Sequence, residues 1–128
     1  MKWIDAKWVD ARTISAGRIS SKLKRMYDTY NRKWFGNRLP RKAIVRWSNK
    51  LKRHGAIGWC APTECPDSPL IEISTEIKRL NSVVRTVMLH EMVHVYFINR
   101  KNSGSAHGKQ FQNKIKSLVV AGAYNDLL

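Results

Sequence analysis

The middle of this chain holds a largely apolar segment, residues 83–98, that carries His90, Glu91 and His94 near its centre. A segment of this length that is apolar on nearly every side is typical of a helix buried within a domain. In such a place an unpaired carboxylate and two unpaired imidazoles would be strongly destabilising, because an interior does not solvate polar or charged groups. The fold therefore has to give these three side chains a partner.

Residues 90–94 read HEMVH and so match the pattern HExxH. On a helix, His90 and His94 project from one face about one turn apart, and both imidazoles can reach a single metal ion. Glu91 then lies beside the water that such a metal binds, where it can accept a proton and return it later. The pattern predicts a zinc-dependent hydrolase with one catalytic ion. The alternative is that both histidines are hydrogen-bonded core residues and that Glu91 pairs with a basic residue.

A catalytic zinc ion usually has three protein ligands and one open position, so a third ligand is needed. Downstream of His94 the candidates are His107 and Asp126, because no glutamate follows the motif as it does in thermolysin-like enzymes. Phe97 and Arg100 stand where the metzincin pattern needs Gly and His. His107 follows a loop of turn-forming residues and begins a helical pattern, so it can face the HExxH helix. Its alternative role is that of a solvated loop histidine.

These motifs resemble the signature of the SprT-like (Spartan-type) domain family of zinc metalloproteases. The HEMVH segment and the later His107-Gly-Lys-Gln-Phe111 are similar to the family's HExxH and HGxxF motifs. Upstream, residues 27–40 are similar to the family's first helix and its end, and residues 57–60 to the strand that follows. The resemblance covers about residues 20–118.

The resemblance implies a zinc endopeptidase in which His90, His94 and His107 bind zinc and Glu91 is the catalytic acid and base. It also implies association with DNA, because family members include proteases that digest proteins crosslinked to DNA. Many members carry a C-terminal zinc ribbon, whereas this sequence ends ten residues after Leu118. We therefore expect a minimal form, in which any DNA contact comes from the catalytic domain itself.

The pattern of elements predicts an α+β fold of the zincin-like metalloprotease kind in a single domain, residues 1–128, with residues 1–19 as an N-terminal extension. Trp3, Ile4 and Trp8 could form one face of a short helix there. A substrate backbone could pair with an exposed edge strand and lie across the metal, which would make cleavage weakly selective for side chains. The expected elements are a helix over 20–35, strands over 43–47, 56–60 and 70–74, the HExxH helix, and a helix that starts at residue 107.

The charge distribution favours a polyanionic partner. The formal net charge is +15, and residues 1–60 hold 16 of the 24 basic residues but 3 of the 9 acidic ones. Such a field attracts nucleic acid through phosphate contacts, and interleaved aromatic residues can stack on the bases of a single strand. An anionic membrane surface and an acidic protein substrate are the alternative partners. The candidate nucleic-acid contacts are Lys22, Lys24, Arg25, Arg32, Lys33, Arg41, Lys42, Arg46, Lys50, Lys52 and Arg53.

Other features narrow the setting. The first residues lack the apolar core of a signal peptide and no segment has the length of a membrane span, so we expect a cytoplasmic, DNA-associated protein without a membrane partner. Cys60 is expected in a buried strand and Cys65 in a loop, without a disulfide. His54 is expected at the surface. The only acidic stretch, which holds Glu64, Asp67, Glu72 and Glu76, could line the cleft or balance local charge.

Two other functions remain compatible with the sequence. The first is a basic nucleic-acid-binding protein with a structural zinc ion and no protease activity, whose site would be closed by Asp126 or a cysteine. The second is a zinc hydrolase that acts on a bond other than a peptide bond. For a peptidase, Tyr96, Tyr124 or a basic side chain could stabilise the developing oxyanion.

Overall fold

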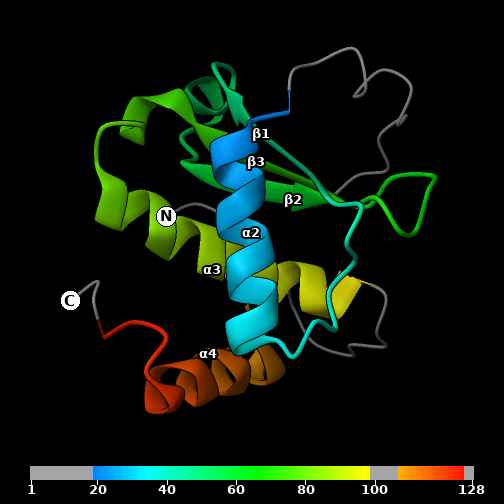
Figure 1. Ribbon diagram of the computed structural model, residues 1–128. Coiled ribbons are helices and arrows are strands. Elements are labelled where there is room, and N and C mark those ends of the chain that lie inside the picture. The colour runs from blue at the N-terminus through cyan, green and yellow to red at the C-terminus, as the bar shows by residue number, and fades with distance from the viewer. Residues whose placement is uncertain (1–18, 99–106, 126–128) are drawn as a thin grey trace.

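The computed structural model describes residues 19–98 and 107–125 and has an α+β fold (Figure 1). Within these residues, three α-helices surround a small mixed sheet of three strands. The elements are α2 (Ser21–Trp34), β1 (Ile44–Ser48), β2 (Gly58–Ala61), β3 (Leu70–Ser74), α3 (Asn81–Ile98) and α4 (Lys109–Ala121), with short 3-10 turns at η1 (Leu51–His54) and η2 (Thr75–Ile77). None of the described helices is long and apolar enough to cross a bilayer.

Helix α2 begins and ends close to the predicted positions. The Ser20 hydroxyl accepts a hydrogen bond from the Leu23 amide, which satisfies one of the free N–H groups of the first turn. At the other end, Gly36 and Asn37 both have φ of +59°, a left-handed conformation that stops the helix. Leu23 and Tyr27 are fully buried, so the inner face of α2 matches the apolar periodicity of the sequence.

The sheet has the order β1-β3-β2, with β1 parallel and β2 antiparallel to β3. The register aligns Val45, Ile71 and Cys60 across the three strands, and all three are buried. The neighbouring row, which points to the opposite face, is Arg46, Glu72 and Trp59. The Glu72 carboxylate accepts from Arg46 Nε at 2.8 Å and from Trp59 Nε1 at 2.6 Å, and these bonds tie the three strands together.

Helix α3 is the centre of the core, as the apolar segment predicts. It contacts β2 and β3 of the sheet and also packs against α2 and α4. Figure 1 shows α3 between the sheet and α4, with α2 crossing in front. Met88, Leu89, Met92 and Val93 are all fully buried, and Glu91 lies at the same depth.

Three expectations need correction or lie outside the described part of the chain. The last helix begins at Lys109 rather than at residue 107, because Gly108 has an extended N-cap conformation that places His107 in the turn before the helix. The strands expected at 43–47 and 56–60 are shifted toward the C-terminus by one or two residues. Trp3, Ile4 and Trp8 lie outside the described residues.

Candidate metal centre

Three histidines converge at one point between α3 and α4. His90 and His94 come from neighbouring turns of α3, and His107 comes from the turn that leads into α4. The Nε2 atoms of His90 and His94 are 3.2 Å apart, those of His90 and His107 are 3.2 Å apart, and those of His94 and His107 are 3.1 Å apart. The structure therefore brings His107 to the two histidines of the motif, as predicted.

This triangle of ring nitrogens cannot be satisfied by hydrogen bonds among its own members. Each nitrogen is either a donor or an acceptor, depending on its tautomer. Among three nitrogens that all contact one another, at least two must be donors or at least two must be acceptors. One of the three contacts therefore brings together two N–H groups or two lone pairs, and it is repulsive. A cation that accepts all three lone pairs removes this conflict.

The spacing and the protonation of the histidines fit a zinc-sized ion. Two nitrogens that each lie 2.0–2.1 Å from a tetrahedral metal are separated by about 3.3 Å, close to the observed separations. Burial, with a smaller contribution from the neighbouring histidines, lowers the pKa of His90 to about 4 and that of His94 to about 2. Burial also lowers the pKa of His107. At neutral pH all three rings are therefore uncharged and have a lone pair to offer.

Phe111 holds the three imidazoles in place from one side. Its ring stacks on that of His94, with centroids 4.4 Å apart and an interplanar angle of 28°. The ring centroids of His90 and His107 both lie 5.0 Å from it. Phe111 is buried on the first turn of α4, so the start of this helix fixes both His107 and the packing around it. The sequence pattern marked Phe111 but did not reveal this role.

Glu91 lies beside the histidines, on the side of α3 that faces β2. Its exposed fraction is 0%, and neither carboxylate oxygen has a hydrogen-bond partner among the described residues. Burial raises the pKa of this carboxyl group. The pKa of the nearby Cys60 thiol is also raised, first by burial and then by the charge of Glu91. A buried carboxyl group without a partner is costly in a core and is a mark of a functional site.

Gly58 in β2 is what allows Glu91 to lie so close to the sheet. A Cβ atom on this residue would be 2.5 Å from Val87 Cγ1 and 3.0 Å from Glu91 Oε2. Both distances are too short for ordinary contacts, so a side chain here would push against α3. The sequence predicts a strand at residue 58, but no local pattern indicates this close approach.

An apolar cavity of about 310 Å³ opens beside His90. Tyr124 contributes to its wall, is only 8% exposed, and has a pKa that burial raises to about 12. Its hydroxyl therefore keeps its proton at neutral pH and can donate. Tyr96, the other tyrosine considered for the oxyanion, has the Lys114 ammonium 4.5 Å from its ring centroid. The cavity is lined by Thr86, His90, Phe111, Gln112, Ile115, Val119 and Tyr124.

The other metal candidates stay apart from this cluster. Among the described residues, the group that can hold a metal contains the three histidines and no cysteine, aspartate or glutamate. Cys60 is buried, Cys65 is exposed, and both are free. His54 is exposed, as expected, and Asp126 lies outside the described residues.

The candidate nucleic-acid contacts come from α2 and from the segments around β1 and η1. All of them are exposed except Lys24, which pairs with Asp28 at 2.6 Å, and Arg46, which pairs with Glu72. Glu72 is buried and its carboxylate accepts from Arg46 and Trp59, so its charge is balanced locally, and it forms part of the wall of a cavity. Four of the contacts share the outer face of α2, namely Lys22, Arg25, Arg32 and Lys33. Lys24 also belongs to α2, and the other six lie in the segments around β1 and η1.

The fold and the site define a class: an α+β protein with a three-histidine cluster built on an HExxH helix. A family model described as "SprT-like family" matches residues 23–125. The chain therefore belongs to the SprT-like family, which is in general a family of zinc metalloproteases. The match reaches beyond residue 118, where the resemblance was expected to end, and so includes Tyr124. A search of curated proteins found no match.

The metal centre predicts that removal of one histidine abolishes tight zinc binding. The wild-type protein should bind about one equivalent of zinc, and His107→Ala should weaken binding by more than about 100-fold, because even outer partners of a metal site contribute 10- to 100-fold. Competition with a chromophoric chelator measures both affinities. His54→Ala, which removes an exposed histidine outside the cluster, should bind as the wild type does. Wild-type affinity in the His107→Ala variant would exclude His107 as a ligand.

The close approach at Gly58 predicts a coupled loss of stability. Gly58→Ala should lower the free energy of unfolding by about 1–3 kcal/mol, because the new methyl group meets Val87 and Glu91. Urea unfolding of the zinc-free protein measures this loss without a contribution from the metal. Val87→Ala makes room, so the double variant should be more stable than the sum of the two losses by at least about 0.5 kcal/mol. Strictly additive losses would show that no clash occurs.

Proposed function

We propose that this protein is a zinc-dependent endopeptidase in which His90, His94 and His107 hold one zinc ion and Glu91 transfers the proton. Zinc, when bound, supplies the Lewis acidity that activates water and polarises a carbonyl group. The observation that carries the proposal is the position of Glu91, which is fully buried beside three convergent imidazoles with both oxygens unpartnered among the described residues. A purely structural zinc site does not require a buried carboxyl group without a hydrogen-bond partner.

Glu91 serves first as the general base and then as the general acid. Its carboxylate takes a proton from the attacking water, and the same oxygen returns that proton to the amine that leaves. Gly58 and Cys60 belong to β2, the strand that faces this carboxyl group. The carboxyl group is therefore held in a water-poor environment with few competing hydrogen bonds. The buried position therefore supports proton transfer in both directions.

The substrate backbone would bind along β2. One edge of this strand pairs with β3, and no strand among the described residues pairs with its other edge. Because Gly58 of β2 lies directly against Glu91, a peptide added to this edge would pass next to the catalytic carboxyl group. Recognition through backbone hydrogen bonds supports the expectation of weak side-chain selectivity.

The apolar cavity beside His90 is the place for a substrate side chain. Its wall of Phe111, Ile115 and Val119 favours an apolar group. Tyr124 lies in the same wall and keeps its proton, so it is our candidate for the donor that stabilises the developing oxyanion.

DNA association completes the proposal. The net charge of +15 and its concentration in the first 60 residues support binding to a polyanion. We propose that the substrates are proteins bound or crosslinked to DNA, and that the protein acts in the compartment that holds DNA. Binding to DNA would raise the local concentration of such substrates around the metal centre.

The proposed role of Glu91 predicts a variant that binds zinc but does not cleave. Glu91→Gln keeps the size of the side chain and removes its ability to hold the proton, so cleavage of a basic, loosely folded protein should fall by about 100-fold or more. Gel electrophoresis of a histone substrate measures cleavage, and chelator competition measures zinc. The variant should retain zinc affinity, because Glu91 is not a ligand.

Glu76→Gln is the matched control, since it makes the same chemical change at an exposed glutamate far from the cluster in the chain. This variant should cleave at the wild-type rate. Equal activity of the Glu91→Gln variant and the wild type would contradict the proposed mechanism. If neither protein cleaves while both bind zinc, the substrate is not a protein or the zinc is structural.

A further inference from the structure

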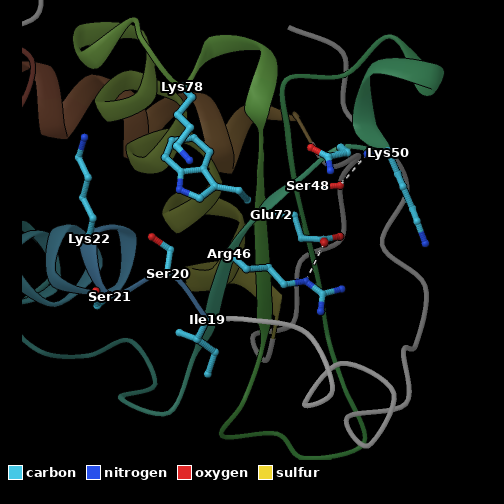
Figure 2. Close-up of a pocket in the computed structure, with 11 residues that line it drawn as sticks. Ile19, Ser20, Ser21, Lys22, Arg46, Ser48, Lys50, Glu72 and Lys78 are labelled. Atoms are coloured by element: carbon cyan, nitrogen blue, oxygen red, sulfur yellow. Dashed lines mark hydrogen bonds and ion pairs between the residues drawn. The ribbon is translucent and has the colours of Figure 1, made fainter.

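A cavity on another part of the described structure lies away from the candidate metal centre and shares no residue with it. It has a volume of about 670 Å³ and is formed where the start of α2, the end of β1 and the segment after η2 meet. Figure 2 shows Lys22, Lys50 and Lys78 on three different sides of the paired Arg46 and Glu72. The lining residues are Ile19, Ser20, Ser21, Lys22, Arg46, Trp47, Ser48, Asn49, Lys50, Glu72 and Lys78.

The charge of this cavity is strongly positive. It is lined by four basic side chains and one carboxylate, and the carboxylate of Glu72 is already paired with Arg46 at 2.8 Å. Lys22, Lys50 and Lys78 are exposed, and within the described residues none of the three pairs with a carboxylate. Cations gathered around a concave, low-dielectric wall focus their field into it, so the cavity favours an anionic ligand.

The start of α2 adds to this preference. The cavity wall includes Ser21 and Lys22, the first residues of the helix, and the first turn contains no acidic residue that would offset the positive end of the helix dipole. The Ser20 hydroxyl is already used to cap the Leu23 amide. The helix terminus therefore strengthens the field that the lysines create.

The cavity also has an apolar side. Trp47 packs partly against the core, and the Lys78 ammonium lies 5.4 Å from its ring centroid. Ile19 is 54% exposed at the mouth. A ligand that fits both surfaces must combine an anion with a flat apolar group, and a cavity of this size accommodates a nucleotide-sized molecule. An inorganic anion alone would leave most of the space unused.

We propose that this cavity seats a short stretch of a single-stranded nucleic acid, with one base against Trp47 and with successive phosphates near Lys22, Lys50 and Lys78. A base in a duplex is paired and stacked and cannot enter a cavity, which is why the ligand is a single strand. The inference deepens the proposed DNA association by naming its location and the form of the nucleic acid. It adds Lys78 to the predicted contacts and leaves the neighbouring Lys52 and Arg53 outside the site.

Binding of a fluorescently labelled thymidine oligonucleotide, followed by anisotropy over a range of salt concentrations, tests the proposal. The full chain is used with Glu91→Gln in every sample, so that the result does not depend on proteolysis. In this background, Lys50→Gln with Lys78→Gln removes two cavity lysines. Lys52→Gln with Arg79→Gln removes two exposed charges that are close in sequence but do not line the cavity.

The cavity variant should bind about 10-fold more weakly or worse, and the slope of log affinity against log salt should fall by about 1.4, since each lost single-strand phosphate contact contributes about 0.7. The control variant should keep the wild-type slope. Equal losses in both variants would overturn the proposal, because they would show a diffuse field without a defined site. Circular dichroism of each variant confirms that it is folded.

Three further measurements separate the possible ligands. Trp47→Leu should weaken binding of the thymidine oligonucleotide by about 5-fold or more and leave binding of an abasic oligonucleotide unchanged, because stacking on the base is lost. A duplex of the same length should bind with no difference between cavity and control variants.

A loss in the cavity variant that is confined to phosphatidylserine vesicles would assign the cavity to a lipid surface and overturn the proposal. Absence of histone cleavage by the Glu91-intact protein, with these binding results intact, would count against the peptidase alone.

Discussion

The mutual approach of three imidazole nitrogens inside the protein is the constraint on which the rest of the site depends. Three ring nitrogens at about hydrogen-bonding distance from one another cannot all pair as donor and acceptor, and burial keeps the rings of His90 and His94 uncharged. The apolar length of α3 places two of them in the core, and the turn before α4 supplies the third. Phe111 closes one side of the cluster, while Gly58 leaves room for the carboxyl group of Glu91 to lie against the sheet.

The two candidate sites lie in different parts of the fold. The metal centre and its apolar cavity lie between α3 and α4, whereas the basic cavity lies where α2 and the end of β1 meet. The ion pair of Arg46 with Glu72 is part of the wall of the basic cavity, and Trp59, the third member of that row, belongs to β2, the strand that lies against Glu91. The sheet is thus a physical connection between the two places. If both proposals hold, one chain can retain a nucleic acid and present a bound protein to the metal at the same time.

Local patterns allowed the helices and the metal cluster to be predicted, because each depends on short-range spacing. The cap at Ser20, the apolar run of α3 and the spacing of HExxH are visible in the sequence, and the single histidine after a turn-rich loop left few choices for the third position. The clearance at Gly58 depends on how closely β2 approaches α3, which no local pattern encodes. The same is true of Glu72, whose two partners come from other strands, and of Lys78, which joins a cavity only when three distant segments meet.

X-ray absorption spectroscopy of the zinc-loaded protein tests the central claim most directly, because it reports the ligands of the ion without requiring a substrate. The account predicts three imidazole nitrogens at about 2.0–2.1 Å and one further light-atom ligand from solvent. Replacing His107 by Ala should remove one imidazole from the spectrum. A sulfur ligand at about 2.3 Å would mean that a cysteine closes the site, and would contradict an open catalytic centre.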